Sequence, residues 1–517
     1  MQLIVPMSGA GQRFLDAGYK IPKPLISVSG KPILQHVIEM FPGIDEVLFI
    51  INEEHALDET LSLQETLYRI APHAEIVVIP RHKQGPAWAI QQAATHINLE
   101  DPVIVNYCDF SCIWNFQDFR KSLESGIDGL IATYSGFHPH MLRNSSYAFL
   151  QMDEKGRVCG IQEKLSYTDS PMMEPASSGT YGFGSGRILL EAIDVQISSD
   201  HSYNKEFYTS LTYKNMIERG LQIQNFPIEK FLQWGTPDDL QDFMDQKKYF
   251  LFRSQYEESQ TSLERVEMLA AGAGKRFIDA GYTTIKPFLP LGEHYLVTEA
   301  IKALGALVHS KRVLFQKTFD IPGGVLQICH SDGIEIELVN GITSGQAESA
   351  LKMLESAQSK NCVVATCDSL LFPDANNYSG IFKGRSLGVW VTEPSNHAMQ
   401  FPSQFGWVLL NESDEIEQVS IKKSPPSFHG WHVITGTFIF GDTAESCNLI
   451  QEFLSNGERI NGEFYLDALI EFAKIRNWTI LGLHPKWFIS LGTPNEYETY
   501  RYWESFFKDN PSYLVEN

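Results

Sequence analysis

The chain lacks the features of a secreted, membrane-bound or nucleic-acid-binding protein. No stretch approaches the ~20 apolar residues that cross a bilayer, and residues 1–6 lack the basic and apolar segments of a signal peptide. Basic residues are scarce, because 41 Lys and Arg stand against 63 Asp and Glu, giving a formal net charge of -22. A nucleic-acid polymer requires a basic surface that displaces counterions. We therefore expect neither a membrane nor a nucleic acid among the partners.

Cysteines are few and do not fit a metal site. The chain has seven, and the closest pair, Cys108 and Cys112, is not followed by a second His/Cys pair. Structural zinc sites need four such ligands at short spacings. The sequence predicts neither zinc nor a disulfide framework, and it favours a reduced, cytoplasmic protein.

What the 517 residues do contain is one sequence written twice. Residues 9–14, Gly-Ala-Gly-Gln-Arg-Phe, return at residues 272–277 as Gly-Ala-Gly-Lys-Arg-Phe. Further blocks follow in the same order: residues 16–19 with 279–282, 23–24 with 286–287, 108–109 with 367–368, 179–180 with 436–437, 206–208 with 463–465, and 235–237 with 492–494. So long a period indicates a duplicated domain rather than a solenoid of short repeats. We expect two domains, residues 1–253 and 264–517, with a polar joint at residues 253–263.

Each copy alternates short apolar runs with segments of helical spacing. In the first copy, strands are predicted at residues 3–7, 46–51, 74–79 and 102–107, and helices at residues 32–40, 57–70 and 86–97. Hairpins are predicted at residues 147–162 and, in the second copy, 407–419. The expected class is α/β: two tandem Rossmann-like domains, each a mainly parallel mixed sheet flanked by helices with a β-hairpin substrate subregion.

A glycine-rich loop follows the first predicted strand of each copy. Glycines let backbone N–H groups approach phosphate oxygens, so the loop predicts a phosphate site. Its members are Ser8, Gly9, Ala10 and Gly11 in the first copy and Gly272, Ala273 and Gly274 in the second. The cations that follow are Arg13 and Lys23 in the first copy and Arg276 and Lys286 in the second. The loop matches neither a P-loop nor a dinucleotide fingerprint.

Together these motifs resemble the sugar-phosphate nucleotidyltransferases, also called nucleoside-diphosphate-sugar pyrophosphorylases, and especially their capsule and surface-polysaccharide members. Gly-x-Gly-x-Arg-Phe and Pro-Lys-Pro-Leu carry the resemblance, with Gln-Gly-Pro-Ala at residues 84–87 and Glu-Lys at residues 163–164. It covers nearly all of the first copy. It implies transfer of a nucleotidyl group from a nucleoside triphosphate to a sugar phosphate or another phosphorylated alcohol, with Mg²⁺ as cofactor and release of pyrophosphate.

The resemblance also implies residue roles. Arg13 would contact the β- and γ-phosphates, Lys23 would offset charge at the α-phosphate, and Asp109 would hold Mg²⁺. The loop residues, Gln84 and Gly85 would bind the nucleotide. The acceptor would meet Glu163, Lys164, Gly179 and Glu206. In the second copy the same roles fall to Arg276, Lys286 and Asp368 (catalysis, with Asp368 on the metal), Gly345 and Gln346 (nucleotide), and Lys423, Gly436 and Glu463 (acceptor).

The pattern also departs from the family. Gln233 and Ser490 stand where many members carry a second metal-binding aspartate. In the second copy, Glu267 interrupts the first strand, and Lys422-Lys423 stands for Glu163-Lys164. We expect the first copy to be the conventional catalytic unit, whereas the second binds a different phosphorylated acceptor or serves as a binding or scaffolding module.

Three more interpretations stay open. A glycosyltransferase using a nucleotide sugar would usually show Asp-x-Asp, but Asp109 and Asp368 lack that partner. A nucleotide-sensing regulatory protein and a dinucleotide-dependent oxidoreductase are the second and third. Tryptophans 88, 114 and 234 are predicted to be core or groove wall, and His82, His138 and His140 surface or core residues. The nucleobase, the acceptor and a homo-oligomeric state are not fixed by the sequence.

Overall fold

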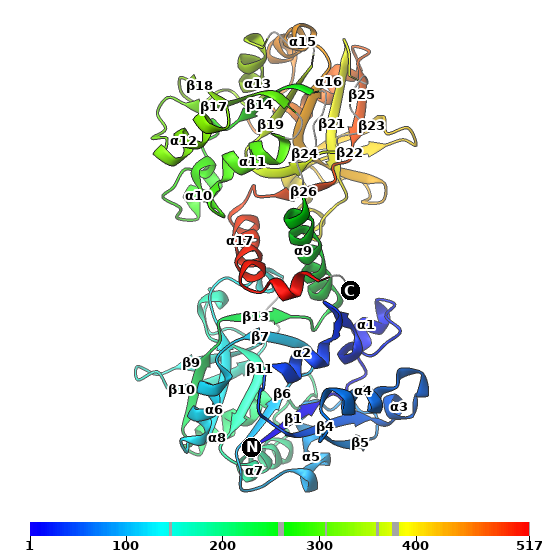
Figure 1. Ribbon diagram of the computed structural model, residues 1–517, viewed down its shortest axis with the longest axis vertical. Helices are drawn as coiled ribbons and strands as arrows, with labels where there is room; N and C mark the ends of the chain where they lie inside the picture. Colours follow the sequence, from blue (N-terminus) through cyan, green and yellow to red (C-terminus); the bar gives the residue numbers. More distant parts are fainter. Residues whose placement is uncertain (144–146, 257–262, 306–307, 358–360, 375–381, 516–517) are drawn as a thin grey trace. The chain divides into compact units, whose positions relative to one another are not determined.

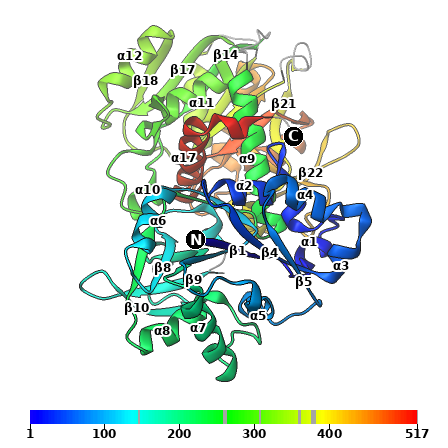
Figure 2. The same cartoon turned by 60° about the horizontal axis from the view of Figure 1, so that its bottom comes forward.

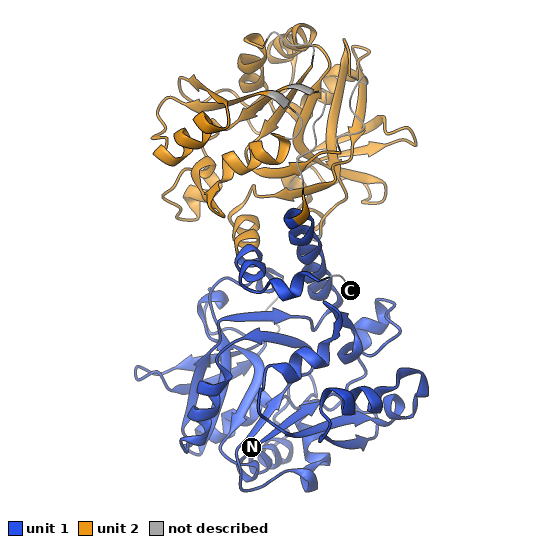
Figure 3. Cartoon of the chain, viewed as in Figure 1, with its two compact units in different colours: residues 1–254, 502–517 blue, residues 255–501 orange. Residues whose placement is uncertain are grey.

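The computed structural model describes residues 1–143, 147–256, 263–305, 308–357, 361–374 and 382–515. The chain forms two compact units (Figure 3). Unit 1 comprises Met1–Ser254 together with Tyr502–Asn517, and unit 2 comprises Gln255–Arg501. The end of the chain therefore belongs to unit 1, whereas the sequence repeat placed it with the second copy. Residues 257–262, in the expected joint, lie outside the described part.

Unit 1 is built on a nine-stranded mixed sheet (Figure 1 and Figure 2). The order is β10-β9-β11-β6-β1-β4-β5, with β8 paired to β11 and β12 to β8. β6, β1, β4 and β5 are parallel, and β11 runs antiparallel to β6. The strands are β1 Gln2–Pro6, β4 Glu46–Asn52, β5 Glu75–Ile79, β6 Val103–Asn106, β8 Gly129–Tyr134, β9 Ala148–Met152, β10 Val158–Glu163, β11 Ala176–Phe183 and β12 Ile223–Pro227.

Two small two-stranded sheets and nine α-helices complete the described part of unit 1. The small sheets pair β2 Ser27–Val28 with β3 Lys31–Pro32, and β7 Phe110–Ile113 with β13 Lys230–Gln233. The helices are α1 Gln12–Asp16, α2 Ile33–Glu39, α3 Glu53–Leu57, α4 Leu63–Ile70, α5 Pro86–Gln92, α6 Phe116–Glu124, α7 Gly186–Ser198, α8 Thr209–Glu218 and α9 Pro237–Gln255. The last residue of α9 is the first of unit 2.

The core explains why the parallel strands read as apolar runs. Every residue of β1 is buried, as expected for a strand covered on both faces. On one face, alternate residues such as Ile4, Leu48 and Val105 pack against the apolar sides of α5, α7 and α8. The loops that follow β1 and β6 leave this packed sheet side by side at its carboxyl edge.

Unit 2 repeats this topology in the order β18-β17-β14-β19-β24-β21-β25, with β22 paired to β24 and β23. Its strands are β14 Leu263–Leu269, β15 Pro290–Leu291, β16 His294–Tyr295, β17 Val308–Gln316, β18 Ile334–Val339, β19 Cys362–Thr366, β20 Ser369–Phe372, β21 Ser386–Thr392, β22 Gly406–Leu410, β23 Ile416–Ile421, β24 Trp431–Phe440, β25 Thr479–Leu483 and β26 Trp487–Ser490. Its helices are α10 Lys275–Asp279, α11 Leu296–Gly305, α12 Gly323–Ser331, α13 Gln346–Glu355, α14 Asn396–Gln400, α15 Thr443–Asn456, α16 Leu466–Lys474 and the first half of α17 Pro494–Asp509. The expected fold class is confirmed.

The predicted strands and hairpins agree with the structure, but two predicted helices are broken. Residues 86–97 divide into α5 and a 3₁₀ turn at Ala94–His96. Residues 57–70 divide into the end of α3, a 3₁₀ turn at Glu59–Leu61, and α4. Asp58 accepts a hydrogen bond from the Thr60 backbone N–H at 3.0 Å, and Ser62 has φ +43°. A capping carboxylate and a left-handed residue both interrupt a helix, although the apolar spacing continues through them.

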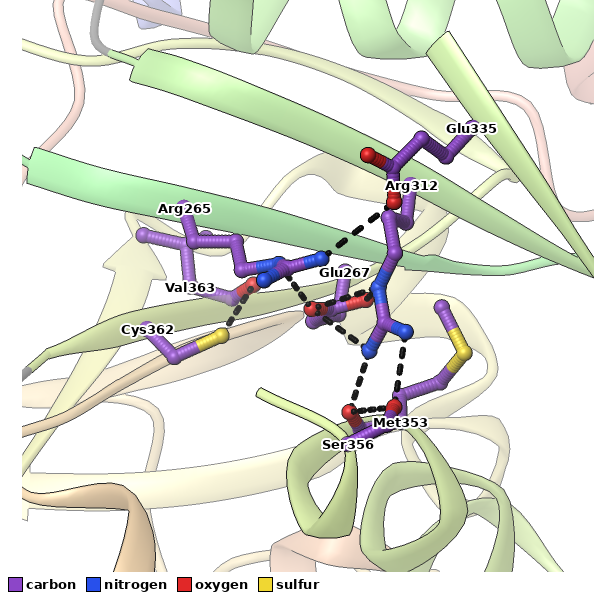
Figure 4. A network of polar contacts seen from close by, with 8 residues as sticks. All are labelled: Arg265, Glu267, Arg312, Glu335, Met353, Ser356, Cys362 and Val363. Atoms are coloured by element: carbon purple, nitrogen blue, oxygen red, sulfur yellow. Dashed lines mark hydrogen bonds and ion pairs between the residues drawn. The ribbon is translucent and has the colours of Figure 1, made fainter. Parts of the chain in front are cut away.

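Glu267, which interrupts the first apolar run of unit 2, is buried in an ion-pair network (Figure 4). Its carboxylate accepts from Arg312 Nε at 2.9 Å and pairs with Arg265 Nε at 2.8 Å. Arg312 also donates to the Ser356 hydroxyl at 2.7 Å. In unit 1 the equivalent register positions on the two strands hold Ile4 and Leu48. The apolar pair of unit 1 is thus replaced by an ion pair at the same two positions of the equivalent sheet in unit 2.

The chain's last residues complete the core of unit 1. Tyr502 donates from its hydroxyl to the Phe231 carbonyl at 2.8 Å, and Trp503 packs edge-on to Phe243 with ring centroids 5.5 Å apart. Tyr513 stacks on His36 at 5.3 Å. Since Phe231 lies in β13, this segment supports a strand that reaches the candidate site. No helix in the described part of the chain is both long and apolar enough to span a membrane.

Candidate functional site

The glycine-rich loop of unit 1 leaves β1 and enters α1. Gly11 caps α1 with φ +63°, a left-handed conformation that favours glycine. A Cβ at Gly9 would meet nothing within 4 Å, so the fold itself does not require glycine there. That open space leaves the backbone accessible to a ligand. Gly274 of unit 2 has the same conformation, with φ +64°.

A cavity of about 840 Å³ opens beside this loop. Its size suits a small-molecule site. The lining includes nearly all of the residues predicted for the first copy: Ser8, Gly9, Ala10, Gly11, Arg13, Lys23, Gly85, Asp109, Glu163, Lys164, Gly179 and Glu206. Gln84 is not among the lining residues, and its role in nucleotide binding stays a prediction. Loops and strand ends far apart in sequence thus meet at one edge of the sheet, where open α/β sheets bind ligands.

Lys23 and Asp109 form the charged centre of this cavity. Lys23 Nζ donates to Asp109 Oδ2 at 2.6 Å and lies 6.0 Å from the centre of the Phe14 ring. Burial works to lower the pKa of Lys23, but the Asp109 carboxylate outweighs it, so the pKa is raised. The lysine is therefore held as a cation at the carboxyl end of β6.

Gln233 lies near Asp109, and a second carboxylate, Asp239, lines the same cavity. β13 pairs with β7 so that Gln233 lies opposite Phe110, and a Cβ built at Gly235 would lie 2.9 Å from Asp109 Oδ2 and 3.0 Å from Gln233 Nε2. Asp239, which also lines the cavity, accepts from the Thr236 hydroxyl at 2.6 Å. Burial raises the pKa of Asp239, with nearby Arg143 opposing the effect.

This oxygen-rich corner fits Mg²⁺ supplied together with a nucleotide. No group of three or more His, Cys, Asp or Glu gathers as a metal cluster within the described ranges. Mg²⁺, however, commonly keeps one or two protein carboxylates and takes its other ligands from phosphates and water. Asp109, with Asp239 as a second carboxylate lining the cavity, matches that donor chemistry.

The structure gives Gly85 a packing role that the sequence did not reveal. Phe207 donates its N–H to the Gln84 carbonyl at 2.8 Å and accepts from the Ala87 N–H at 2.9 Å. A Cβ on Gly85 would lie 2.7 Å from both the N and O atoms of Phe207. The second copy repeats this contact between Gly345 and Phe464, at 2.6 Å. Glycine is thus required for close backbone approach, which joins the predicted nucleotide segment to the Glu-Phe-Tyr block.

The end of the cavity that is predicted to bind the acceptor contains a lysine held by aromatic rings. Lys164 Nζ donates to the Tyr208 hydroxyl at 2.7 Å and lies 4.4 Å from the centre of that ring. The Tyr208 hydroxyl in turn donates to Glu206. Lys164 has φ +59°, an uncommon conformation for a residue with a side chain, and strain of this kind concentrates at functional sites. Two of the predicted acceptor contacts, Lys164 and Glu206, therefore belong to one connected network.

Glu163 lies just beneath this network. It is buried, and its carboxylate accepts from the Ser210 hydroxyl at 2.5 Å. Burial raises the pKa of Glu163, while Ser210 and Lys164 oppose the rise. Ser210 is the second residue of α8, so this helix fixes the carboxylate on β10.

Several cavity residues were not singled out from the sequence as ligand contacts. His82 Nε2 and the Ser8 hydroxyl form a hydrogen bond of 2.8 Å. The imidazole also packs on Trp88, with ring centroids 4.5 Å apart. Burial lowers its pKa. His82 is half-buried, as a surface or core residue would be, and it also lines the cavity. The sole sequence signal was its place two residues before Gln84.

The other two histidines are core residues, as predicted. His138 and His140 are buried, and His140 bonds to the Tyr134 hydroxyl at 3.1 Å. Burial lowers the pKa of His138 to about 4. Trp234 is fully buried, which confirms its predicted core position.

Unit 2 brings two of its predicted residues, Lys286 and Asp368, together. Lys286 Nζ donates to Asp368 Oδ2 at 3.0 Å, and the Thr366 hydroxyl donates to Asp368 Oδ1 at 2.5 Å. Although burial alone would raise the pKa of Asp368, Lys286 and Thr366 lower it to about 2. The lysine–carboxylate pair of unit 1 is therefore present a second time.

One correspondence in unit 2 changes, and the nucleotide-binding role of Gln346 stays a prediction. Lys422, rather than Lys423, corresponds to Lys164: it follows β23 as Lys164 follows β10, and its φ is +53°. The one-residue error arose because Lys-Lys was aligned to Glu-Lys by identity, whereas the strand register shifts the pair. Gln346 occupies the place of Pro86 at the start of its helix, and its side chain accepts from the Leu466 N–H at 3.5 Å.

Comparisons with known proteins find nucleotidyltransferases that are similar to this chain. Residues 4–248 match the family profile Nucleotidyl transferase. Over 260 residues the chain is 24% identical to a glucose-1-phosphate thymidylyltransferase of Streptomyces antibioticus, an alignment covering 47% of this chain and 65% of that protein. Over 74 residues it is 30% identical to a UTP–glucose-1-phosphate uridylyltransferase of Haemophilus ducreyi, covering 13% and 25%. The alignments thus span less than two thirds of either relative.

Among solved structures, a nucleoside-diphosphate-sugar pyrophosphorylase from Vibrio cholerae RC9 is similar to the chain. It is 21% identical and has a TM-score of 0.40, and the match covers 47% of this chain and 100% of that chain. The family profile confirms the resemblance predicted for the first copy: residues 4–248 carry the Nucleotidyl transferase pattern, and its homologues are sugar-phosphate nucleotidyltransferases.

Proposed function

We propose that unit 1 transfers a nucleotidyl group from a nucleoside triphosphate to a sugar phosphate or another phosphorylated alcohol. An oxygen of the acceptor phosphate bonds to the α-phosphorus, the bond from that phosphorus to the bridging oxygen breaks, and pyrophosphate leaves. The observation that carries the proposal is one cavity lined by the glycine-rich loop, Arg13, the Lys23–Asp109 pair and Lys164.

The residues divide this work by position. The loop backbone and Arg13 hold the β- and γ-phosphates, and Lys23 offsets charge that develops around the α-phosphate. Lys164 holds the acceptor phosphate, while Glu206 accepts from an acceptor hydroxyl. Such a reaction requires positioning and charge neutralisation, and no side chain need form a covalent intermediate.

Asp109 and the nucleotide phosphates would hold Mg²⁺. When bound, the ion supplies positive charge against the phosphate oxygens. Lys23 supports Asp109 from the other side, since its Nζ already bonds to Oδ2 at 2.6 Å. This pair orients the remaining oxygen, Oδ1, for a ligand in the cavity.

We further propose a cytoplasmic protein that supplies an activated precursor for surface polysaccharide. The names of the two relatives describe transfer of a thymidylyl or uridylyl group to glucose 1-phosphate, which supports a sugar 1-phosphate as acceptor class. The nucleobase is the part of the substrate that the cavity's chemistry leaves undefined.

The test is a pyrophosphate-release screen of the common nucleoside triphosphates against a panel of phosphorylated acceptors. At least one pairing should release pyrophosphate through unit 1, and Lys23→Ala should reduce kcat for that pairing by about 10²-fold or more. Lys20→Ala is a matched control, because this exposed lysine on the rim of the same cavity makes no ion pair among those described and has no assigned role. Nucleotide binding without pyrophosphate from any pairing would support a nucleotide-sensing regulatory protein instead.

A further inference from the structure

Unit 2 has rebuilt, rather than lost, the acceptor end of its site. In unit 1 that end holds Ala148 on β9, Glu163 on β10 and Ser210 on α8. The strand pairing places Ala148 opposite Glu163, and in unit 2 it places Gly406 opposite Ile421. The buried carboxylate of β10 therefore has no counterpart on β23.

The carboxylate reappears on the neighbouring helix. Asp467 is the second residue of α16, as Ser210 is of α8, and the preceding tyrosine caps each helix. Asp467 is 8% exposed, the same fraction as Glu163. Burial raises the pKa of Asp467 to about 6, and Lys422 opposes the rise.

Gly406, which stands where unit 1 has Ala148, makes room for Asp467, which stands where unit 1 has Ser210. A Cβ on Gly406 would overlap Oδ2 of Asp467 and would lie 3.0 Å from Ile434. An alanine there, as in unit 1, would therefore require Asp467 to shift from its present position. The three differences, at Ile421, Asp467 and Gly406, form one coupled exchange. It keeps a buried carboxylate, but the residue that carries it lies on a helix instead of a strand. Independent decay of an unused site does not explain such compensation.

Lys422 remains next to this carboxylate. Its backbone N–H donates to the Phe405 carbonyl at 3.0 Å, as that of Lys164 does to the Tyr147 carbonyl at 2.8 Å. Its ammonium lies 5.2 Å from the centre of the Tyr465 ring and donates to the Gln404 carbonyl at 2.6 Å. Burial lowers the pKa of Lys422, whereas Asp467 raises it. The charges that act on Lys422 also include Arg276, Asp368 and Glu463. The residues predicted to bind the phosphates and those predicted to bind the acceptor therefore lie near one another.

The floor of the site changes as well. Tyr107, whose hydroxyl accepts from the Thr209 N–H at 3.2 Å in unit 1, is replaced by Thr366. Tyr147 is replaced by Phe405. A phenol ring and a second phenolic hydroxyl are therefore missing, and an acceptor in unit 2 would meet a different arrangement of hydrogen-bonding groups.

We propose that unit 2 is a second nucleotidyl-transfer site that takes a phosphorylated polyol different from the acceptor of unit 1, with Lys422 on its phosphate and Asp467 on a hydroxyl. The inference rests on the function proposed for unit 1. The step is the same: an acceptor phosphate oxygen bonds to the α-phosphorus, and pyrophosphate leaves. Asp467 is a specificity residue, because a buried group that hydrogen-bonds a hydroxyl rejects an analogue lacking it.

The experiment uses the full-length chain in two backgrounds. Lys286→Ala disables unit 2 and reports unit 1, whereas Lys23→Ala disables unit 1 and reports unit 2. Each is screened for pyrophosphate release against sugar 1-phosphates and straight-chain and cyclic polyol phosphates. The two chains should prefer different acceptors. In the Lys23→Ala background, Asp467→Asn should lower kcat/KM for the preferred acceptor about 10-fold or more while leaving KM for the triphosphate unchanged. Glu412→Gln, an exposed charge in unit 2, is the matched control.

The exchange of all three residues is the sharper variant. Asp467→Ser with Gly406→Ala and Ile421→Glu restores the unit 1 trio, and it should move the acceptor preference of unit 2 toward that of unit 1. An unchanged melting temperature would show that the variant folds.

The outcomes separate the two claims. An active Lys286→Ala chain beside a Lys23→Ala chain that releases no pyrophosphate, or that prefers the same acceptor, overturns this inference alone. A silent Lys286→Ala chain overturns the function proposed for unit 1 and with it the basis of the inference. Insensitivity of the unit 2 acceptor to Asp467→Asn overturns the role of that residue.

Discussion

The buried Glu267–Arg312 pair allows a quantitative comparison between the two copies. Removing Arg312 as Arg312→Leu leaves a fully buried carboxylate with only Arg265 beside it. Breaking a buried ion pair in this way costs about 3–5 kcal/mol, because the remaining charge loses its compensation. For a domain of this size, 1 kcal/mol corresponds to roughly 2–4 °C, so unit 2 should melt roughly 6–20 °C lower.

Unit 1 supplies the matched control, since its equivalent positions hold Ile4 and Leu48 in the same strand register. The double variant Glu267→Ile with Arg312→Leu should recover most of the loss, because replacing both partners of a buried ion pair with apolar residues is often neutral or stabilising. Arg265 would keep its ion pair with Glu335, at 3.5 Å.

Hydrogen–deuterium exchange of peptides from β14 and β17, with a thermal scan of the whole chain, assigns the effect to unit 2. The single variant should speed exchange in these strands, and the double variant should slow it again. If the double variant is as unstable as the single one, the apolar and ionic pairs are not equivalent solutions of one sheet, and the reasoning fails.

Three further perturbations test other parts of the account. Gly85→Ala should raise KM for the triphosphate at least ~10-fold, since the added Cβ would sit 2.7 Å from the Phe207 backbone; an unaltered KM would contradict the contact. The free energy of unfolding of unit 1 should be highest above pH 6.5. Between pH 6.5 and pH 4, His138 should lower it by up to about 3 kcal/mol, because the folded state holds this residue neutral. His138→Phe should flatten that slope in pH-dependent urea titrations, and an identical slope would refute the assignment. Truncation after Arg501 should lower the melting temperature of unit 1 more than that of unit 2, since it removes buried aromatic rings; calorimetry showing equal shifts would argue otherwise.

Much of the fold was predictable because its signals are local and occur twice. The apolar runs of β1 and β4 are short and almost wholly buried, and their length with the turns that bound them identifies strands. The Lys23–Asp109 pair was expected only as two separate family motifs. Its contact follows from topology, because β6 lies beside β1 at the edge where the loops emerge.

What the sequence could not show depends on contacts between distant residues. The exchange among Gly406, Ile421 and Asp467 is invisible in a linear alignment, because the carboxylate changes element. The strand register that places Lys422 at the position of Lys164 is likewise a property of pairing, not of identity. The attachment of the final 16 residues to unit 1 arises from aromatic packing that no repeat signal records.

The central claim is tested most directly by ³¹P NMR of the Lys286→Ala chain supplied with Mg²⁺, a nucleoside triphosphate and a sugar 1-phosphate. We expect equal amounts of pyrophosphate and a pyrophosphate-linked nucleotide sugar. Adding Lys23→Ala should abolish both products. Adding Lys164→Ala should lower the acceptor-dependent rate. Triphosphate that stays intact with every acceptor, or that is hydrolysed without forming a linked product, would contradict nucleotidyl transfer by unit 1.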